Sequence, residues 1–241
     1  MVEALEKILA NSSRIVFFGG AGVSTESGIP DFRSVDGLYH QKYAYPPKTI
    51  LSHRFWEENT AEFYKFYREK MIFKGAKPNA AHLRLARLEA EGKLKAVITQ
   101  NIDGLHQAAG SKTVYELHGS VHRNYCIGCG KFYGPEFIAQ STGVPRCTAC
   151  GCLVKPDVVL YQEGLDQQTL SGAVKAIRSA DTLIIGGTSM VVYPAAGLVD
   201  YFRGDNLVVI NMQPTRADRT ASLCIAAPIG QVLDPDTPLQ L

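Results

Sequence analysis

Five short apolar runs are spaced along the chain and predict buried strands. They lie at residues 14–18, 96–99, 113–117, 182–186 and 207–211. Amphipathic or helix-favouring segments around them predict helices at 2–10, 52–71, 79–90, 102–109, 167–178 and 194–203. Continuous apolar strands that alternate with helices are typical of a parallel sheet covered on both faces. The pattern therefore predicts an α/β fold of this kind.

Polar clusters follow the predicted strands at the point where each strand ends. They fall at residues 19–24, 99–103, 118–120, 186–189 and 211–213. In an open parallel sheet, ligands bind in the crevice outside the carboxyl ends of the strands. The five clusters together predict one binding crevice at that edge.

The cluster after the first strand is rich in glycine. Gly19, Gly20 and Gly22 would allow the backbone to turn sharply and approach a ligand closely. Ser24 or Thr25 can cap a short following helix, whose first N–H groups would face an anion. The match to the dinucleotide-binding pattern G-x-G-x-x-G is partial, because a threonine holds the third place. An ordinary tight strand–helix turn remains an alternative at this point.

Residues 123–154 interrupt the alternation with two cysteine hooks. These are Cys126-x-x-Cys129 and Cys147-x-x-Cys150. Their spacing predicts a four-cysteine zinc ribbon, and four sulfur ligands leave no open position for catalysis, so the metal would be structural. We expect Cys152 not to be a ligand and Cys224 to be a core or loop residue.

Composition narrows the class of protein. The chain has 241 residues, 46% of them hydrophobic, and a net charge of +2. This charge predicts no nucleic-acid surface, and the apolar runs are too short to predict a membrane span. The amino-terminal pattern is not that of a signal peptide, so we expect a cytoplasmic protein, in which cysteines indicate metal binding more than disulfides. A monomer is the expected state.

One histidine stands out among six. His118 follows the third predicted strand and precedes a glycine, so it would face the crevice, and an ordinary pKa of about 6.5 suits a general base at neutral pH. The others are expected to be structural or surface residues: His40, His53, His82, His106 and His122. The aromatic residues between 55 and 67 are expected to pack in a core.

In combination, these motifs make the chain resemble a sirtuin, an NAD-dependent protein deacylase of the compact bacterial and archaeal kind. The motifs are G-A-G-V-S-T-E-S-G-I-P-D-F-R (20–33), T-Q-N-I-D-G-L-H (99–106), E-L-H-G-S (116–120), the cysteine hooks, G-T-S-M-V-V-Y-P (187–194) and V-I-N (209–211). The resemblance implies a Rossmann-like NAD-binding domain and a small domain. We expect the first at 1–34, 75–122 and 155–241, and the second to combine a helical insert (35–74) with the zinc ribbon (123–154).

The resemblance also implies how NAD is held. The phosphate loop would comprise Gly20, Ala21, Gly22 and Thr25, followed by Asp31, Phe32 and Arg33. Phe32 would cover the reacting ribose and Arg33 would order the loop, so that both form a lid that orders when NAD binds. The ribose and nicotinamide would meet Gln100, Asn101, Ile102 and Asp103, and the adenosine half would meet Gly187, Thr188, Ser189, Asn211 and Met212. A backbone contact near Pro228 or Ile229 is also implied.

The implied reaction is lysine deacetylation. The acyl oxygen of the modified lysine attacks the anomeric carbon of NAD and expels nicotinamide, with Asn101 at the reactive centre. His118 then takes a proton from a ribose hydroxyl, the freed oxygen attacks the intermediate, and water releases free lysine and O-acetyl-ADP-ribose. Two alternatives are protein ADP-ribosyl transfer and a non-enzymatic NAD-sensing zinc module. The retained catalytic and substrate motifs argue against the first, and the intact Asn101, Asp103 and His118 argue against the second, since a sensor needs no base.

Acetylated proteins are the implied partners, and two places in the sequence bear on how they bind. The substrate backbone would lie against Val159, Leu160, Tyr161 and Val192. Relatives often have phenylalanine and glycine where Tyr161 and Gln162 stand. Relatives that remove acidic acyl groups carry Tyr-x-x-Arg in the insert, whereas here Tyr67 follows Tyr64 at that spacing and Arg68 comes one place later. We therefore expect neutral acyl groups, chiefly acetyl.

Overall fold

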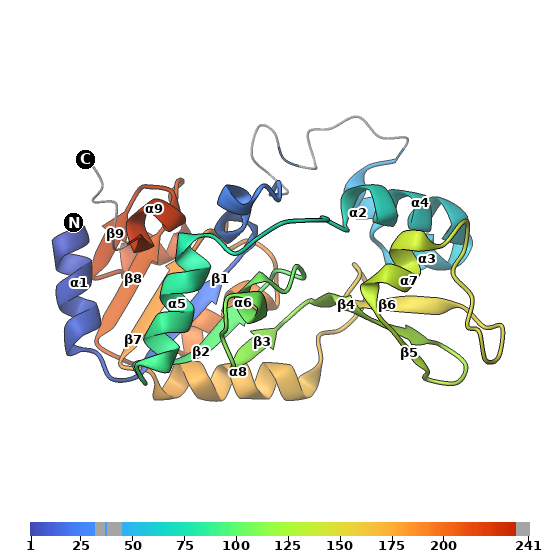
Figure 1. Cartoon of the computed structure of the whole chain (residues 1–241). Helices are drawn as coiled ribbons and strands as arrows, with labels where there is room; N and C mark the ends of the chain where they lie inside the picture. Colours follow the sequence, from blue (N-terminus) through green and yellow to red (C-terminus); the bar gives the residue numbers. More distant parts are fainter. Residues whose placement is uncertain (32–36, 38–44, 235–241) are drawn as a thin grey trace.

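A six-stranded parallel sheet forms the larger part of the molecule. The computed structural model describes residues 1–31, 37 and 45–234 (Figure 1). The strands of the sheet are β1 (Ile15–Gly19), β2 (Leu94–Thr99), β3 (Val114–Glu116), β7 (Thr182–Gly186), β8 (Asn206–Ile210) and β9 (Leu223–Ile225). Their order is β3-β2-β1-β7-β8-β9, and every neighbouring pair is parallel. The predicted sheet is confirmed, with β9 as an additional edge strand.

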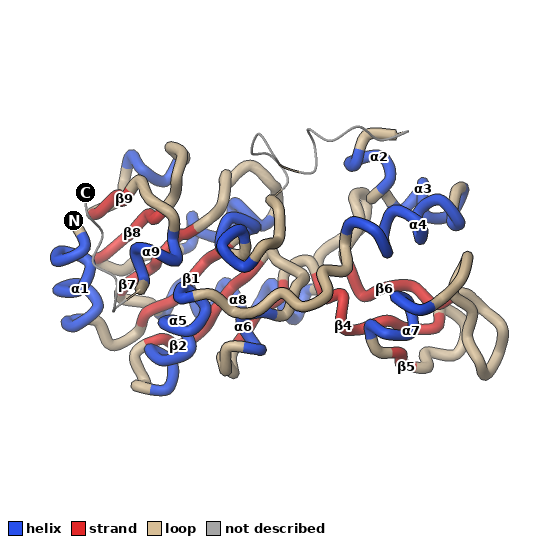
Figure 2. Tube along the Cα trace, turned by 45° about the horizontal axis from the view of Figure 1, so that its top comes forward, coloured by secondary structure: helices blue, strands red, loops and turns tan. Residues whose placement is uncertain are grey.

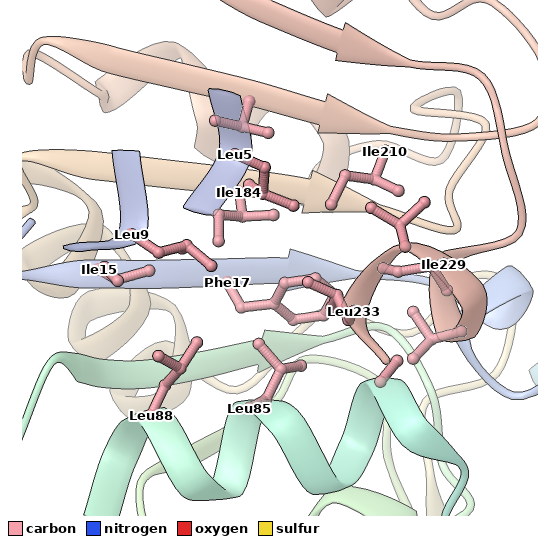
Figure 3. Close-up of a cluster of buried hydrophobic side chains, with 14 of the residues drawn as sticks. Leu5, Leu9, Ile15, Phe17, Leu85, Leu88, Ile184, Ile210, Ile229 and Leu233 are labelled. Carbon is pink, nitrogen blue, oxygen red and sulfur yellow. The ribbon is translucent and has the colours of Figure 1, made fainter. Parts of the chain in front are cut away.

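Helices cover both faces of this sheet, as the apolar pattern predicts. One face carries α1 (Val2–Asn11), α5 (Ala80–Ala90) and α9 (Ile229–Leu233), whose leucines and isoleucines meet Phe17 of β1 (Figure 3). The other face carries α8 (Gln167–Ser179) and the 3₁₀ helix η4 (Ala195–Tyr201), which pack on Val16 and Phe18. Successive side chains of a strand point to opposite faces, so a strand buried on both sides is apolar throughout.

A second, smaller group of elements lies beside the parallel sheet (Figure 2). Its buried side chains form a core of their own. Its sheet has the order β5-β4-β6 and is antiparallel, with β4 (Gly119–Cys126), β5 (Phe132–Tyr133) and β6 (Val154–Val158). Its helices are α2 (Pro47–Ile50), α3 (His53–Glu58), α4 (Thr60–Lys70) and α7 (Pro135–Gln140). The aromatic residues of α3 and α4 are buried here, which confirms their predicted packing role. The domain boundaries given above stay a prediction.

Several helices differ from their predicted extent. The helix expected at 52–71 is divided into α3 and α4 at Asn59, whose backbone leaves the helical region (φ −131°, ψ 45°). An asparagine side chain competes with the helical hydrogen bonds, which makes it a weak point in a helix. The helix expected at 102–109 is reduced to α6 (Leu105–Ala108), because Gly104 before it adopts a left-handed φ of 72°. Among the described helices, none is both long and apolar enough to cross a membrane.

Candidate active site and zinc site

The glycine-rich loop lies at the point where the strand order reverses. β1 is flanked by β2 and β7, and a crevice opens at the carboxyl ends of strands at such a switch point. The Gly22 N–H donates to the Gly187 carbonyl at 2.8 Å, and a Cβ on Gly22 would lie 2.9 Å from the Gly187 Cα. Only a glycine permits this contact between two backbones. The loop after β1 and the loop after β7 therefore form one continuous wall.

Ser24 belongs to this site in a way that the sequence did not indicate. The predicted helix cap is wrong, because the segment forms two 3₁₀ turns, η1 (Ala21–Val23) and η2 (Thr25–Ser27), and neither has a side-chain cap. The Ser24 hydroxyl is buried and instead donates to Asp103 Oδ2 at 2.7 Å. It also accepts from Asn101 Nδ2 at 3.1 Å. Ser24 thus joins the glycine loop to the polar cluster after β2.

The cluster after β2 is held in place from several sides. Asp103 Oδ1 accepts from the Leu105 N–H at 2.9 Å, and His122 Nε2 donates to the Asp103 carbonyl at 2.9 Å. The Ile102 carbonyl accepts from the Val121 N–H at 3.0 Å. These bonds fix the direction of the carboxylate, which is the group expected to meet the nicotinamide carboxamide. His122 was predicted to be only a structural or surface residue. It is exposed, but its bond to the Asp103 carbonyl supports the site.

His118 lies in the turn between β3 and β4, next to this cluster. Its Nδ1–H donates to the Gln100 carbonyl at 3.0 Å. In the neutral ring this bond leaves Nε2 unprotonated and able to accept a proton. Burial lowers the pKa of His118, and the Gln100 carbonyl opposes the shift. The ring is therefore held as a neutral base at physiological pH.

Two other histidines are structural, as predicted. His82 and His106 are buried, with ring centroids 4.7 Å apart, and His106 also lies against Phe17. Burial lowers the pKa of His106 to about 3 and that of His82 to about 4. Both rings are thus neutral in the folded protein at ordinary pH.

The residues expected on the adenosine side are linked to the same cluster. Gln100 Nε2 donates to Thr188 Oγ1 at 3.0 Å, and the Thr188 N–H donates to Asn211 Oδ1 at 3.0 Å. Ser189 and Met212 are exposed beside them. Hydrogen bonds thus connect the ends of β2, β7 and β8.

Pro228 and Ile229 lie at the start of α9. Pro228 occupies the position before the helix, and Ile229 is buried against Gly186 at the end of β7. Glu26 Oε2 accepts from the Gly230 N–H at 2.6 Å, which ties η2 to this helix. The expected backbone contact with the cofactor therefore falls close to the phosphate loop.

The expected lid is only partly within the described residues. Thr25 is exposed, with its hydroxyl donating to the Gly22 carbonyl at 3.0 Å, and Asp31 is half-buried. Phe32 and Arg33 lie outside the described residues, so their roles stay predictions.

Four cysteines come together at one end of the small sheet. They are Cys126, Cys129, Cys147 and Cys150, and their sulfur atoms all lie within 4.8 Å of one another. The Sγ distances are 3.3 Å from Cys126 to Cys150 and 3.6 Å from Cys129 to Cys147. A tetrahedral zinc with Zn–S bonds of about 2.3 Å places its sulfurs about 3.8 Å apart, so the donor set fits zinc. Tyr133 donates to the Cys147 sulfur at 3.1 Å, as a group that orients a metal ligand does.

The remaining two cysteines lie outside this cluster. Cys152 is exposed beside Gly128 and its carbonyl accepts from the Cys147 N–H at 2.7 Å. Cys224 lies in β9 but is exposed, so the predicted choice of a core or loop position is wrong. Successive side chains of a strand point to opposite faces. The next residue of β9, Ile225, is buried in the core, so the Cys224 side chain points away from it. All six thiols, which fall within the described ranges, are free of disulfides.

The segment expected to bind the substrate follows β6. The Val159 N–H donates to the His118 carbonyl at 3.0 Å, which brings this segment directly to the catalytic candidate. The Leu160 side chain is buried, so only its backbone could meet a peptide. Gln162 has a left-handed φ of 79°, a conformation that glycine adopts more readily than any other residue. Val192, the other residue expected to contact the peptide, is half-buried, and Met190 also has a positive φ, of 55°.

Comparison with known proteins gives a consistent result. A model of the Sir2 family matches residues 20–194. An NAD-dependent protein deacetylase of Clostridium acetobutylicum is 61% identical, covering 97% of this chain and 96% of that protein. The corresponding protein of Clostridium perfringens is 60% identical, covering 96% of each.

Solved structures agree with these relatives. A structure that describes the mechanism and regulation of Sir2 enzymes is 42% identical, with a TM-score of 0.87, and covers 97% of this chain and 94% of that one. A structure of Sir2 with a p53 peptide and NAD⁺ is 40% identical, with a TM-score of 0.85, and covers 97% and 95%. Similarity of this extent, across sequence and structure, shows that the chain belongs to the Sir2 family.

Proposed function

We propose that this protein is an NAD-dependent protein lysine deacetylase. The observation that carries the proposal is the His118 ring, hydrogen-bonded to Gln100 beside the Ser24–Asn101–Asp103 cluster, at the carboxyl ends of the strands that the glycine loop follows. A dinucleotide loop alone would suit a redox enzyme as well. A base and an amide beside the loop instead suit a reaction at the ribose. The relatives named above carry the same activity in their names.

In this mechanism, bound NAD supplies an anomeric carbon with nicotinamide as its leaving group. Asp103 and Ile102 would hold the carboxamide of the nicotinamide. Ser24 keeps the Asp103 carboxylate and the Asn101 amide in fixed directions, so neither group must reorient during the reaction. His118 Nε2 would take the proton from a ribose hydroxyl, while its Nδ1–H stays bound to the Gln100 carbonyl.

Zinc would take no part in this chemistry. The four cysteines would complete its tetrahedral shell, and the cluster lies at the far end of β4 from His118. β4 begins at Gly119, directly after His118, and ends at the ligand Cys126. The metal would therefore stabilise the strand whose other end positions the base.

The decisive experiment follows two products in one incubation. With NAD and an acetyl-lysine peptide, we expect equal amounts of free nicotinamide and deacetylated peptide, measured by chromatography and mass spectrometry. Nicotinamide release without deacetylation would favour ADP-ribosyl transfer or hydrolysis of NAD. If neither product formed, the NAD-sensing zinc module would become the better interpretation.

We also propose a preference for neutral acyl groups. The Tyr64 hydroxyl donates to the Val154 carbonyl, and the Arg68 guanidinium donates to the Gly143 carbonyl at 2.8 Å and to Ser141 at 3.1 Å. Both members of the possible acid-binding pair are thus bound to residues of the small core and its loop. A succinyl carboxylate would be left without a cation, which costs about 1–3 kcal/mol or more. We expect kcat/KM to be roughly tenfold to a hundredfold lower for a succinyl peptide than for an acetyl peptide.

Arg68→Ala serves as the control for this preference. Because its guanidinium is directed to the loop at 141–143, its removal should leave the ratio of the two kcat/KM values unchanged. A faster reaction with the succinyl peptide, lost in Arg68→Ala, would contradict the proposal and identify Arg68 as the acyl-binding cation.

A further inference from the structure

Glu163 is a half-buried carboxylate that joins three parts of the chain. It follows the expected substrate segment, and its side chain is 20% exposed. Oε2 accepts from the Leu160 N–H at 2.8 Å, within the same turn. Oε1 lies 2.7 Å from His53 Nδ1, at the start of α3, and 3.1 Å from Lys155 Nζ, in β6. One carboxylate thus ties the substrate segment to both the helical insert and the small sheet.

The same segment is bound to the insert through its backbone. The Tyr161 N–H donates to the Leu51 carbonyl, and the His53 N–H donates to the Tyr161 carbonyl, both at 2.9 Å. These two bonds make a parallel bridge between Ser52 and Tyr161. At its other end the segment is bonded to the His118 carbonyl through Val159. Its position relative to the catalytic histidine therefore depends on how firmly residues 51–53 and Glu163 hold it.

We propose that Glu163 is a positioning residue for peptide binding, which holds the segment 159–161 against α3, and that the protonated form of His53 strengthens this hold. The inference rests on the proposed deacetylase function. It assigns no chemical step to Glu163, because its carboxylate is occupied by Leu160, His53 and Lys155. Its expected effect is on the affinity for the acetylated peptide.

The charged groups around His53 set the direction of the pH dependence. Nδ1 faces Glu163, Nε2 lies 3.3 Å from Glu57 on the same helix, and Lys155 is the cation on the opposite side of Glu163. The hydrogen bond to Glu163 raises the pKa of His53. The ion pair between protonated His53 and Glu163 is therefore fully formed below the ordinary histidine pKa of about 6.5. It is lost as pH rises through the raised pKa of His53. Lys155 keeps its charge in this range, so the hold on the segment is only partly lost.

The structure gives a reason why the segment needs this support. Gln162 carries the strained φ of 79° between Tyr161 and Glu163, and its side-chain Oε1 accepts from the Arg54 N–H at 3.1 Å. A non-glycine residue in this conformation costs free energy, which neighbouring contacts must offset. Two of those contacts come from the start of α3, where His53 and Arg54 lie.

The test measures KM for an acetyl-lysine peptide, KM for NAD, and kcat in Glu163→Gln and His53→Asn, between about pH 6 and pH 8. Glutamine keeps an acceptor for Leu160 but removes the charge, so we expect the peptide KM to rise about tenfold. We expect the KM for NAD to be unchanged and kcat to stay within about threefold, since no reacting group is altered. In His53→Asn, the rise of the peptide KM with pH should disappear.

The control is Glu91→Gln, which removes a more exposed ion pair, to Arg87 of α5 at 2.9 Å. It should leave all three constants unchanged. An unchanged peptide KM in Glu163→Gln, or a pH dependence that persists in His53→Asn, would overturn the inference while the wild-type activity stands. If Glu163→Gln fails to fold, the half-exposed His53→Asn decides alone. A wild-type protein without deacetylation would overturn the proposed function, and this inference with it.

Discussion

Replacing His118 by alanine is expected to lower kcat for deacetylation by about 10²- to 10⁴-fold, the usual contribution of a general base. The ring has one nitrogen bound to the Gln100 carbonyl, which leaves the other nitrogen to accept the proton, and alanine has no group that could do so. The measurement is deacetylation of an acetyl-lysine peptide at saturating NAD. Zinc content and the circular dichroism spectrum should be those of the wild type, because His118 lies in a turn outside the strands.

The pH profile of the wild-type enzyme checks the same role. A base must be unprotonated, and burial lowers the pKa of His118 in the folded protein. The rate should therefore persist as pH falls to the ordinary histidine pKa of about 6.5 and decline only at lower pH, through the lowered pKa. Full activity in His118→Ala would show that another group is the base. So would a fall in rate with decreasing pH that begins above about pH 6.5.

Replacing Cys126 by alanine is expected to abolish stoichiometric zinc binding and destabilise the small core. Binding of a structural zinc to such sites contributes about 10–16 kcal/mol to folding, and much of this is lost with one ligand. Cys126 is buried at the end of β4, so loss of this zinc ligand should destabilise β4, whose other end begins directly after His118. Metal analysis should give little zinc per chain, and thermal unfolding should begin at a lower temperature.

Cys152→Ala is the matched control for this variant. Cys152 lies only two residues beyond the ligand Cys150 but is exposed and outside the sulfur cluster. We expect full zinc content and an unchanged melting temperature. Zinc retained by Cys126→Ala but lost from Cys126→Ala/Cys152→Ala would show that Cys152 can replace a ligand, contrary to the assignment.

The larger sheet could be predicted from the sequence because its strands are buried on both faces. The strand predicted at 182–186 coincides with β7, since every one of its residues is buried and the run ends at glycine. The edge strand β9 was missed, because three residues with one exposed side chain give no such pattern. The break at Asn59 was missed for a related reason: the aromatic residues before and after it belong to one core, so the apolar pattern continues across it.

The place of a residue at the end of a strand was enough to predict that His118 and the cluster at 100–103 lie together, and spacing alone predicted the four-cysteine cluster. The roles of residues 100–103 came from the family resemblance, and they stay predictions. Ser24 was not found, because a serine after a glycine turn suits a helix cap equally well, and its partner Asp103 is distant in sequence. The contacts of Glu163 were not predicted either, because its partners His53 and Lys155 become neighbours only when the insert folds onto β6.

The position of β1 has a consequence for synthesis of the chain on the ribosome. β1 pairs on one side with β7, so that Ile15 lies opposite Thr182. Until that later part has been made, one edge of β1 has no partner, and an exposed apolar edge is prone to pair with other chains. The phosphate loop also lacks its wall at Gly187 during this time. We therefore expect the nascent amino-terminal half to be unable to bind NAD and to depend on chaperones.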